Sequence, residues 1–302
     1  PCDSALRVRI SQGSGLPRPP EPALRPVVGA TMSNESDSGP EITPQIHVES
    51  DGPIRILTID APPANCYSYL LMKQLDEAIL EARFDPETHV IILRSEGSKF
   101  FCAGADIGML QSVTPEWKYS FCLHANETLS RLEQTPKLVI AEIQGHCVGG
   151  GLEMALACDI RIACSGNSRI GVPEVQLGVL PGTGGTQRLA RLLGKASALE
   201  WCIEGKMISM KEAMHEGLVQ KVFPEEGFSQ AVREYAQSLA PPQGAGLAVG
   251  LIKRSIQGGA DLGLQDGLSL ERELQQRLFQ SEDAQEGMAA NRERRTPEFE
   301  GR

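Results

Sequence analysis

Long hydrophobic runs are missing from this sequence, and so are the residue clusters that typically hold metals. No stretch of about 18 apolar residues occurs, which excludes a membrane-spanning helix. Histidine is scarce, with 5 in 302 residues, and none of the 8 cysteines forms a CxxC pair. We therefore expect no zinc site and interpret the cysteines, several of which lie in apolar stretches, as reduced buried thiols. No internal repeat is visible, which argues against solenoid and propeller architectures.

Basic residues are fewer than acidic residues in this sequence. The 29 lysines and arginines face 39 aspartates and glutamates, for a net charge of −10 and an isoelectric point of about 5.1. Because an acidic chain repels phosphates, we expect neither nucleic acid nor an anionic membrane as a partner. Apolar content of 41% and charged content of 23% are ordinary for globular proteins. The length suits one large domain or two modest ones with a sizeable core.

The first 45 residues differ in composition from the rest. They are rich in proline, arginine and serine and show no helical or strand period, so 1–45 is predicted to be a disordered N-terminal extension. The excess of arginine over acidic residues resembles an organelle transit peptide. Alternatively, Met32 is the natural start and 1–31 is upstream or added sequence. A cytoplasmic protein is the default expectation, with the mitochondrial matrix as the alternative if 1–31 is a transit peptide.

From residue 46 on, strand and helix patterns alternate. Short apolar runs predict strands at residues 54–59, 90–94, 138–145, 159–164 and 219–223. Periodic apolar spacing predicts helices at residues 68–82, 115–134, 151–157, 185–193, 196–204, 210–216, 228–240, 245–257 and 264–280. This alternation predicts an α/β layer architecture over 46–240. The remainder, 241–302, is predicted to be a helical region that forms subunit contacts.

A glycine run at Gly149–Gly151 lies between a predicted strand and a predicted helix. Glycines allow a ligand to approach the backbone, and the first N–H groups of a helix have no internal partner. Such a place can bind an anion or a developing oxyanion. A tight turn with close helix packing would use the same glycines. The GxGxxG spacing of dinucleotide-binding proteins is absent.

Two carboxylates lie in apolar surroundings. Glu153 is flanked by Leu152 and Met154, and Glu174 follows a proline in a stretch that ends in the loop 180–186. Burying a carboxylate is costly unless it has a partner or a function. The two residues are candidates for paired acid–base catalysis, and structural carboxylates in salt bridges are the alternative. The run of small residues at 101–107 also exposes backbone N–H groups, as an ordinary loop would.

Together these segments resemble the crotonase superfamily, and within it enoyl-CoA hydratase, over about residues 46–302. The matching segments are FCAGADI, AEIQGHCVGGGLEMALACDIRIA, GVPEVQLGVLPGTGGTQRLARLLGKASALE, GKMISMKEAMHEGLVQKVFP and SEDAQEGMAANRERRTPEFEGR. The resemblance implies an α/β fold, a crotonase-like spiral of ββα turns with two nearly perpendicular sheets. It also implies C-terminal helices at a trimer interface, and therefore a homotrimer or a homohexamer.

The resemblance further implies a catalytic site. The backbone N–H groups of Ala105 and Gly150 would bind the thioester oxygen, Glu153 and Glu174 would activate water and move the α-proton, and the N–H of Gly182 would orient the water. Other positions that match the family's substrate contacts are Ala64, Cys66, Ala103, Asp106, Ile107, Gly149 and Pro173. The positions that match contacts to the CoA of a neighbouring subunit are Phe279 and Arg294.

The implied activity is hydration of the 2,3 double bond of an enoyl-CoA, a lyase reaction of fatty acid metabolism. No cofactor or metal is expected, because CoA enters as part of the substrate. The presence of both acids favours hydration, since simple isomerases of this superfamily usually keep only the second. An isomerase, hydrolase or decarboxylase of the same fold remains an alternative. An RNA-binding homologue would need a basic helix, and residues 110–134 hold only two bases. A homologue without catalysis would not need the acids and glycines.

Overall fold

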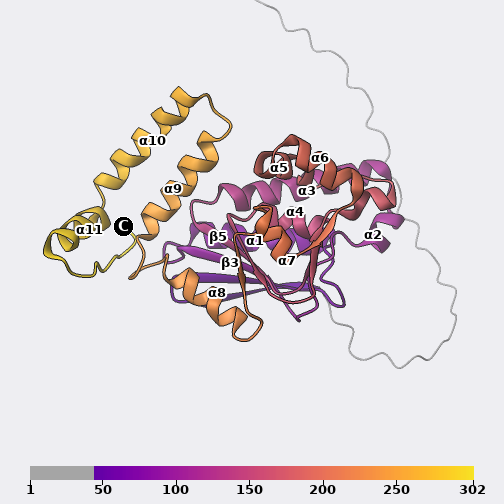
Figure 1. The fold of residues 1–302 in the computed structure, drawn as a ribbon, viewed down its shortest axis with the longest axis horizontal. Coiled ribbons are helices and arrows are strands. Elements are labelled where there is room, and N and C mark those ends of the chain that lie inside the picture. The colour runs from indigo at the N-terminus through magenta and orange to yellow at the C-terminus, as the bar shows by residue number, and fades with distance from the viewer. Residues whose placement is uncertain (1–43) are drawn as a thin grey trace, which may run out of the picture. The chain divides into compact units, whose positions relative to one another are not determined.

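The computed structural model describes residues 44–302. The predicted N-terminal extension, 1–45, lies outside the described residues except for its last two positions. The predicted transit peptide, 1–31, lies outside them entirely. Within 44–302 the strands form a six-stranded and a four-stranded sheet (Figure 1). The first sheet has the order β1 (Gln45–Asp51), β2 (Ile54–Asp60), β3 (Val90–Ser95), β5 (Leu138–Ile143), β7 (Ile160–Cys164) and β10 (Lys221–Phe223). The second has the order β4 (Phe100–Cys102), β6 (His146–Val148), β8 (Arg169–Gly171) and β9 (Met207–Ser209).

The chain passes repeatedly from the first sheet to the second and then into helices. It does so at β3–β4, at β5–β6 and at β7–β8, which is the predicted ββα spiral. The helices of this part are α1 (Tyr69–Phe84), α2 (Ile107–Ser112), α3 (Pro115–Gln134), α4 (Gly150–Leu156), the 3-10 helix η1 (Pro173–Leu177), α5 (Gly185–Leu193), α6 (Lys195–Glu204), α7 (Met210–His215) and α8 (Phe228–Gln237). Those of the C-terminal region are α9 (Gly246–Gly259), α10 (Leu264–Phe279) and α11 (Glu282–Glu293).

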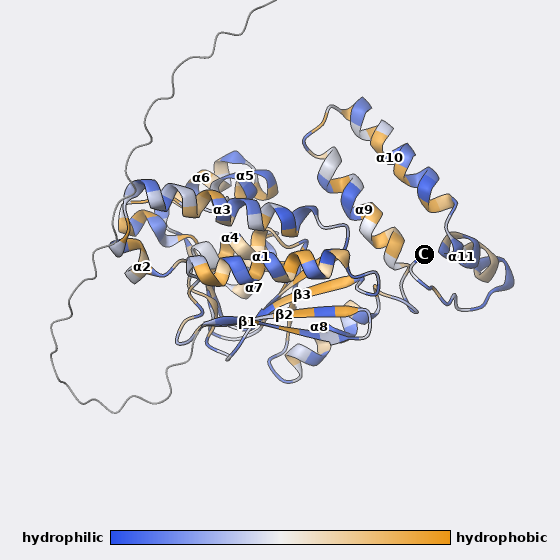
Figure 2. Ribbon diagram, turned by 180° about the vertical axis from the view of Figure 1, so that it is seen from behind, coloured by the Kyte–Doolittle hydropathy of each residue, from blue (hydrophilic) through white to orange (hydrophobic). Residues whose placement is uncertain are grey.

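The central strands of the six-stranded sheet are buried on both faces. In β3, Ile91 and Leu93 pack into the larger apolar cluster, which includes residues of α1 and α3. Val90 and Ile92 point the other way and pack with α8. Figure 1 shows α1 and α8 on opposite sides of β3, and Figure 2 shows the apolar character of that strand. Parallel strands covered on both faces read as continuous apolar runs, which is why the sequence identified β3 and β5.

The N-terminal edge strand was not predicted. β1 pairs antiparallel with β2 along its whole length, so Gln45, which we placed in the extension, pairs with Asp60. Most β1 side chains are exposed, and an edge strand of this kind lacks the apolar alternation that marks a buried one. The strands of the second sheet are three residues long, too short for a periodic signal.

The C-terminal helices attach to the core through a buried ion pair. The ammonium of Lys253 in α9 lies 2.8 Å from the carboxylate of Asp159 at the start of β7. The same ammonium donates to the carbonyl of Lys137 at 3.0 Å. Large apolar side chains of this region are exposed in the single chain, namely Ile252, Ile256, Leu262, Leu264, Phe279 and Met288. The role of 241–302 in oligomerisation stays a prediction. No helix within 44–302 has the length and apolarity needed to cross a membrane.

Candidate active site

Glu153 lies in α4 with only 2% of its surface exposed. Its carboxylate accepts three hydrogen bonds of 2.7 Å from the loop before α5 and from the first residue of that helix. The N–H groups of Thr183 and Gly185 donate to Oε1, and the Thr183 hydroxyl donates to Oε2. Burial raises the pKa of Glu153, while these hydrogen bonds and the charge of Arg188 oppose that rise. The loop therefore compensates much of the cost of burying this carboxylate.

Glu174 in η1 approaches the start of α4 from another side. Its Oε1 lies 3.0 Å from the position that a Cβ atom on Gly149 would take. Its Oε2 is buried and has no hydrogen-bond partner within residues 44–302. Burial, together with the nearby charge of Glu153, raises the pKa of Glu174 to about 7. The two acids thus share a site but differ in hydrogen bonding, which is the arrangement expected of an acid–base pair.

Two backbone N–H groups near these acids have no hydrogen-bond partner among residues 44–302. Tyr67 binds the loop on both sides of Ala105, donating from its N–H to Gly104 O and accepting at its carbonyl from Asp106 N. The N–H of Ala105 lies between these bonds and has no partner within the described part of the chain. Gly150 is the first residue of α4, and its N–H likewise has no partner among residues 44–302.

The glycines of the two segments let these donors come close together. A Cβ atom on Gly104, which has a φ of +95°, would lie 3.1 Å from the nitrogen of Gly150. A Cβ atom on Gly151 would lie 2.1 Å from the carbonyl oxygen of Cys102. β4 therefore packs directly on the first turn of α4, and side chains at these positions would separate the two elements.

The remaining predicted catalytic and acyl-binding positions lie in or next to the segments that carry the two acids. Gly182 precedes Thr183, and its carbonyl accepts a 3.3 Å hydrogen bond from the amide of Asn126. The N–H of Gly182 has no hydrogen-bond partner among residues 44–302. Pro173 is the first residue of η1 and Gly149 is the N-cap of α4.

The predicted substrate-binding positions of the two loops also lie together. Ala103 N–H donates to the carbonyl of Ala64 at 3.0 Å. Burial and the charge of the nearby Asp106 raise the pKa of the Cys66 thiol. Asp106 caps α2, and Ile107 follows it with 54% of its surface exposed. The loop after β4 and the segment before α1 thus form one surface.

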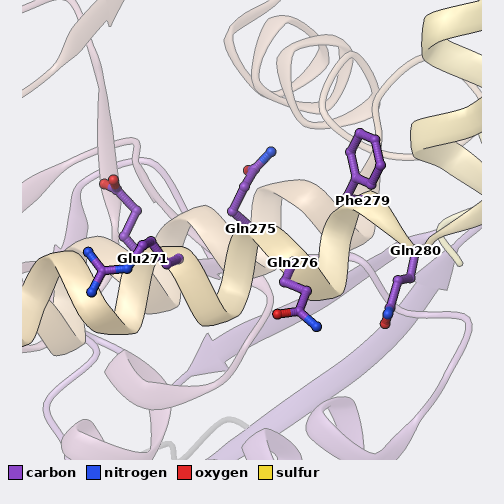
Figure 3. A pocket seen from close by; sticks show the side chains of 6 residues that line it. Glu271, Gln275, Gln276, Phe279 and Gln280 are labelled. Atoms are coloured by element: carbon purple, nitrogen blue, oxygen red, sulfur yellow. The ribbon is translucent and has the colours of Figure 1, made fainter.

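Phe279 and Arg294 lie in other segments of the chain. Phe279 is 63% exposed at the end of α10, where it lines a depression of about 530 Å³ with other residues of that helix (Figure 3). Arg294 ends α11 in a left-handed conformation with a φ of +58°. The structure describes a single chain, so their contact with the CoA of a neighbouring subunit stays a prediction.

Comparison with known proteins identifies the family. Residues 49–302 match the family model described as enoyl-CoA hydratase/isomerase. The chain belongs to this family. The chain is 37% identical to the short-chain-enoyl-CoA hydratase of Clostridium acetobutylicum over 249 residues, which cover 82% of this chain and 94% of the relative.

Solved structures support the same assignment. An enoyl-CoA hydratase from Geobacillus kaustophilus matches with a TM-score of 0.83 and 45% identity, covering 85% of this chain and 97% of the other. An enoyl-CoA hydratase from Bacillus anthracis matches with a TM-score of 0.81 and 34% identity, covering 85% and 99%. The predicted crotonase-like fold is therefore confirmed.

Tyr67 and Thr183 were not predicted to belong to the site of this member of the enoyl-CoA hydratase/isomerase family. Both are buried, and the Tyr67 hydroxyl lies 2.9 Å from Thr183 Oγ1. The Tyr67 ring also packs near Phe121, with 6.1 Å between ring centroids. Thr183 is the one hydroxyl residue in the run PGTGG (181–185), and this is the only feature of the sequence that could have pointed to its role.

Proposed function

We propose that this chain is an enoyl-CoA hydratase that adds water across the 2,3 double bond of an enoyl-CoA thioester. The observation that carries the proposal is the contrast between two neighbouring buried carboxylates. Glu153 accepts three hydrogen bonds, whereas Oε2 of Glu174 accepts none from residues 44–302. Membership of the enoyl-CoA hydratase/isomerase family supports an acyl-CoA substrate.

The N–H groups of Ala105 and Gly150 bind the thioester oxygen in this proposal. Binding there draws electrons from the double bond and stabilises the enolate that forms when water attacks Cβ. One such donor typically contributes a factor of about 10²–10³ to the rate. The unpaired state of both N–H groups within the described chain supports this role.

Glu153 acts as the base and Glu174 as the acid. A carboxylate offers about four acceptor positions, and Glu153 uses three on the loop, so one remains for water. As the water oxygen bonds to Cβ, its proton passes to Glu153 and the electrons of the double bond move to the thioester oxygen. The enolate then takes a proton at Cα from Glu174, whose pKa of about 7 keeps it partly protonated at neutral pH. The N–H of Gly182 orients the water.

The loops around the site bind the rest of the substrate. We assign the adenine and pantetheine of CoA to the surface that Ala64, Cys66, Ala103, Asp106 and Ile107 form, with Gly149 and Pro173 beside the acyl group. This scheme moves only protons and electron pairs between substrate, water and side chains. It therefore requires no cofactor besides the CoA of the substrate itself.

The C-terminal region forms subunit contacts in the same proposal. The exposed apolar side chains of α9 and α10 support association into a homotrimer or a homohexamer. Phe279 and Arg294 then contact the CoA bound by a neighbouring copy.

Loss of the conjugated-thioester absorbance of crotonyl-CoA tests the activity. The wild type is expected to remove the absorbance, and Glu174→Gln to slow this by about 10²–10⁴-fold. A 3-enoyl-CoA, on which an isomerase would generate the same absorbance, and a thiol assay for released CoA serve as parallel arms. Absorbance gained from the 3-enoyl-CoA, or release of CoA, without any hydration would contradict the proposal.

A further inference from the structure

Tyr67 and Thr183 form a chain of hydrogen bonds that ends on Glu153. The Tyr67 hydroxyl lies 2.9 Å from Thr183 Oγ1, and Thr183 Oγ1 donates to Glu153 Oε2 at 2.7 Å. We infer that Tyr67 is a positioning residue, which acts through the Thr183 hydroxyl to hold Glu153 as an ionised and oriented base. The inference deepens the proposed hydratase function and rests on it.

The chemistry of the groups fixes the direction of the chain. An ionised carboxylate only accepts, so the single proton of the Thr183 hydroxyl points to Glu153. Thr183 Oγ1 must then accept from Tyr67, whose hydroxyl donates. Burial and the charge of Glu153 raise the pKa of Tyr67 well above its ordinary value, so Tyr67 stays a neutral donor. Hydrogen bonds in such a chain strengthen one another, which favours the charged form of Glu153.

Tyr67 also contacts the segments that carry the two proposed oxyanion donors. Its N–H and carbonyl hold the loop residues on either side of Ala105, at 2.9 Å and 3.0 Å. A Cβ atom on Gly150 would lie 2.3 Å from the Tyr67 hydroxyl, so this hydroxyl packs on the first turn of α4. Tyr67 thus contacts the segments that carry Ala105, Gly150 and the partner of Glu153. The ring atoms Cε1 and Cζ of Tyr67 lie 2.8 Å and 2.9 Å from the same Cβ position on Gly150, so the ring and backbone keep the donors in place when the hydroxyl is removed, and the loss of the hydroxyl should act on the base.

Other charged or titratable groups face Glu153 from three elements. Arg188 in α5 lowers the pKa of Glu153, and its guanidinium is itself bound to Glu133 at 2.9 Å. Glu174 in η1 and Cys202 in α6 are the further titratable neighbours. Replacement of Tyr67 by phenylalanine alters none of these groups and removes no charge. A shift in the titration of Glu153 in that variant would therefore report the hydroxyl chain.

The test is the pH profile of kcat/KM for crotonyl-CoA in wild type, Tyr67→Phe, Thr183→Val and the double variant. The acidic limb of this profile reports the pKa of the base, Glu153. Weakening the hydrogen-bond chain should raise this apparent pKa by roughly half a unit in Tyr67→Phe and by about one unit in Thr183→Val. Tyr67→Phe should add nothing in the Thr183→Val background, since the intermediate hydroxyl is gone. Thr183→Ser, which keeps the hydroxyl, should restore the wild-type limb. Tyr119→Phe, at an exposed tyrosine of α3, is the matched control.

Two outcomes would overturn the inference. One is an unchanged acid limb in Tyr67→Phe with active protein, and the other is a shift that persists undiminished in the Thr183→Val background. An infrared titration of the carboxyl groups, with the Glu153 band assigned by loss in Glu153→Gln, reads the same pKa without turnover. If the wild type fails to hydrate any enoyl-CoA but the infrared shift is present, the proposed function fails while the hydrogen-bond chain stands. If hydration occurs without either shift, only the chain fails.

Discussion

The carboxylate of Glu174 lies against the α-carbon of Gly149, with Oε1 3.0 Å from the place of a missing Cβ. Gly149 also has φ +57° and ψ −126°, a conformation that side-chain-bearing residues rarely adopt. Two separate physical reasons thus require glycine at the N-cap of α4. One concerns the backbone, and the other concerns the position of the proposed acid.

Gly149→Ala is expected to impair activity far more than a comparable glycine substitution elsewhere. The added methyl group displaces the Glu174 carboxylate, so we expect kcat to fall by about 10²-fold or more. Gly217→Ala is the control, because Gly217 has a φ of +82° with open space around its Cβ position. Gly217→Ala should lose about 1–3 kcal/mol of stability and Gly149→Ala at least as much, and only Gly149→Ala should lose activity. Equal activity in the two variants would contradict the assignment of Glu174.

Glu174→Gln is expected to stabilise the protein at alkaline pH. The pKa of Glu174 is about 7 in the folded chain against an ordinary value of 4.5. Its contribution to stability is therefore fully present below about pH 4.5 and lost as the pH rises to about 7. Above pH 7 the variant should exceed the wild type by about 2 kcal/mol, a figure reduced for the partial exposure of the group.

Thermal unfolding from pH 4.5 to pH 8 measures this difference. Glu271→Gln is the control, because it makes the same change from carboxylate to amide at an exposed position. Glu174→Gln and the wild type are expected to melt at similar temperatures near pH 4.5 and to diverge as the pH rises. A constant difference across the range would show that burial does not perturb Glu174.

The rate of hydration should fall above neutral pH. The proposed acid must be protonated in the free enzyme, so kcat/KM is expected to decline about tenfold per pH unit above about pH 7. Because Glu153 and Glu174 interact, the measured value belongs to the pair. Steady-state rates across pH 5–9, corrected for spontaneous thioester hydrolysis, measure the decline. A flat profile up to pH 9 is incompatible with Glu174 as the acid.

Lys253→Met is expected to destabilise the attachment of α9. The ammonium of Lys253 is buried beside Asp159, at 2.8 Å. Removing it leaves a buried carboxylate without its counter-ion, which typically costs about 3–5 kcal/mol. Lys73→Met removes the lysine of an exposed pair in α1 and should change the melting temperature little. Similar melting temperatures for the two variants would show that Asp159 is satisfied by its other partners.

The sequence predicted the elements whose signal is local. The apolar runs of β3 and β5 and the amphipathic spacing of α3, which stops before Pro136, predicted those elements closely. β1 was missed because its side chains are exposed, and the short strands of the second sheet because three residues carry no period. The glycine run and the two glutamates were predicted as candidate site residues because glycine-rich turns and acids in apolar segments are visible in the local sequence, and the family resemblance supplied their roles.

The hydrogen bonds of the site could not be predicted in the same way. Tyr67 and Thr183 are separated by 116 positions, and their contact depends on how β4, α4 and the loop before α5 pack. A tyrosine in an apolar segment predicts burial, and a threonine in a glycine loop predicts a turn. Neither pattern reveals that both serve one carboxylate.

Water addition is tested by the mass of the product formed from crotonyl-CoA in water enriched in oxygen-18. The expected product is an intact thioester that has gained one labelled water, with the label on the hydroxyl at Cβ. The reaction should need both acids, so Glu153→Gln and Glu174→Gln should each suppress it. Free CoA with label in the released acid, or an isomer of unchanged mass, would contradict water addition by the two glutamates.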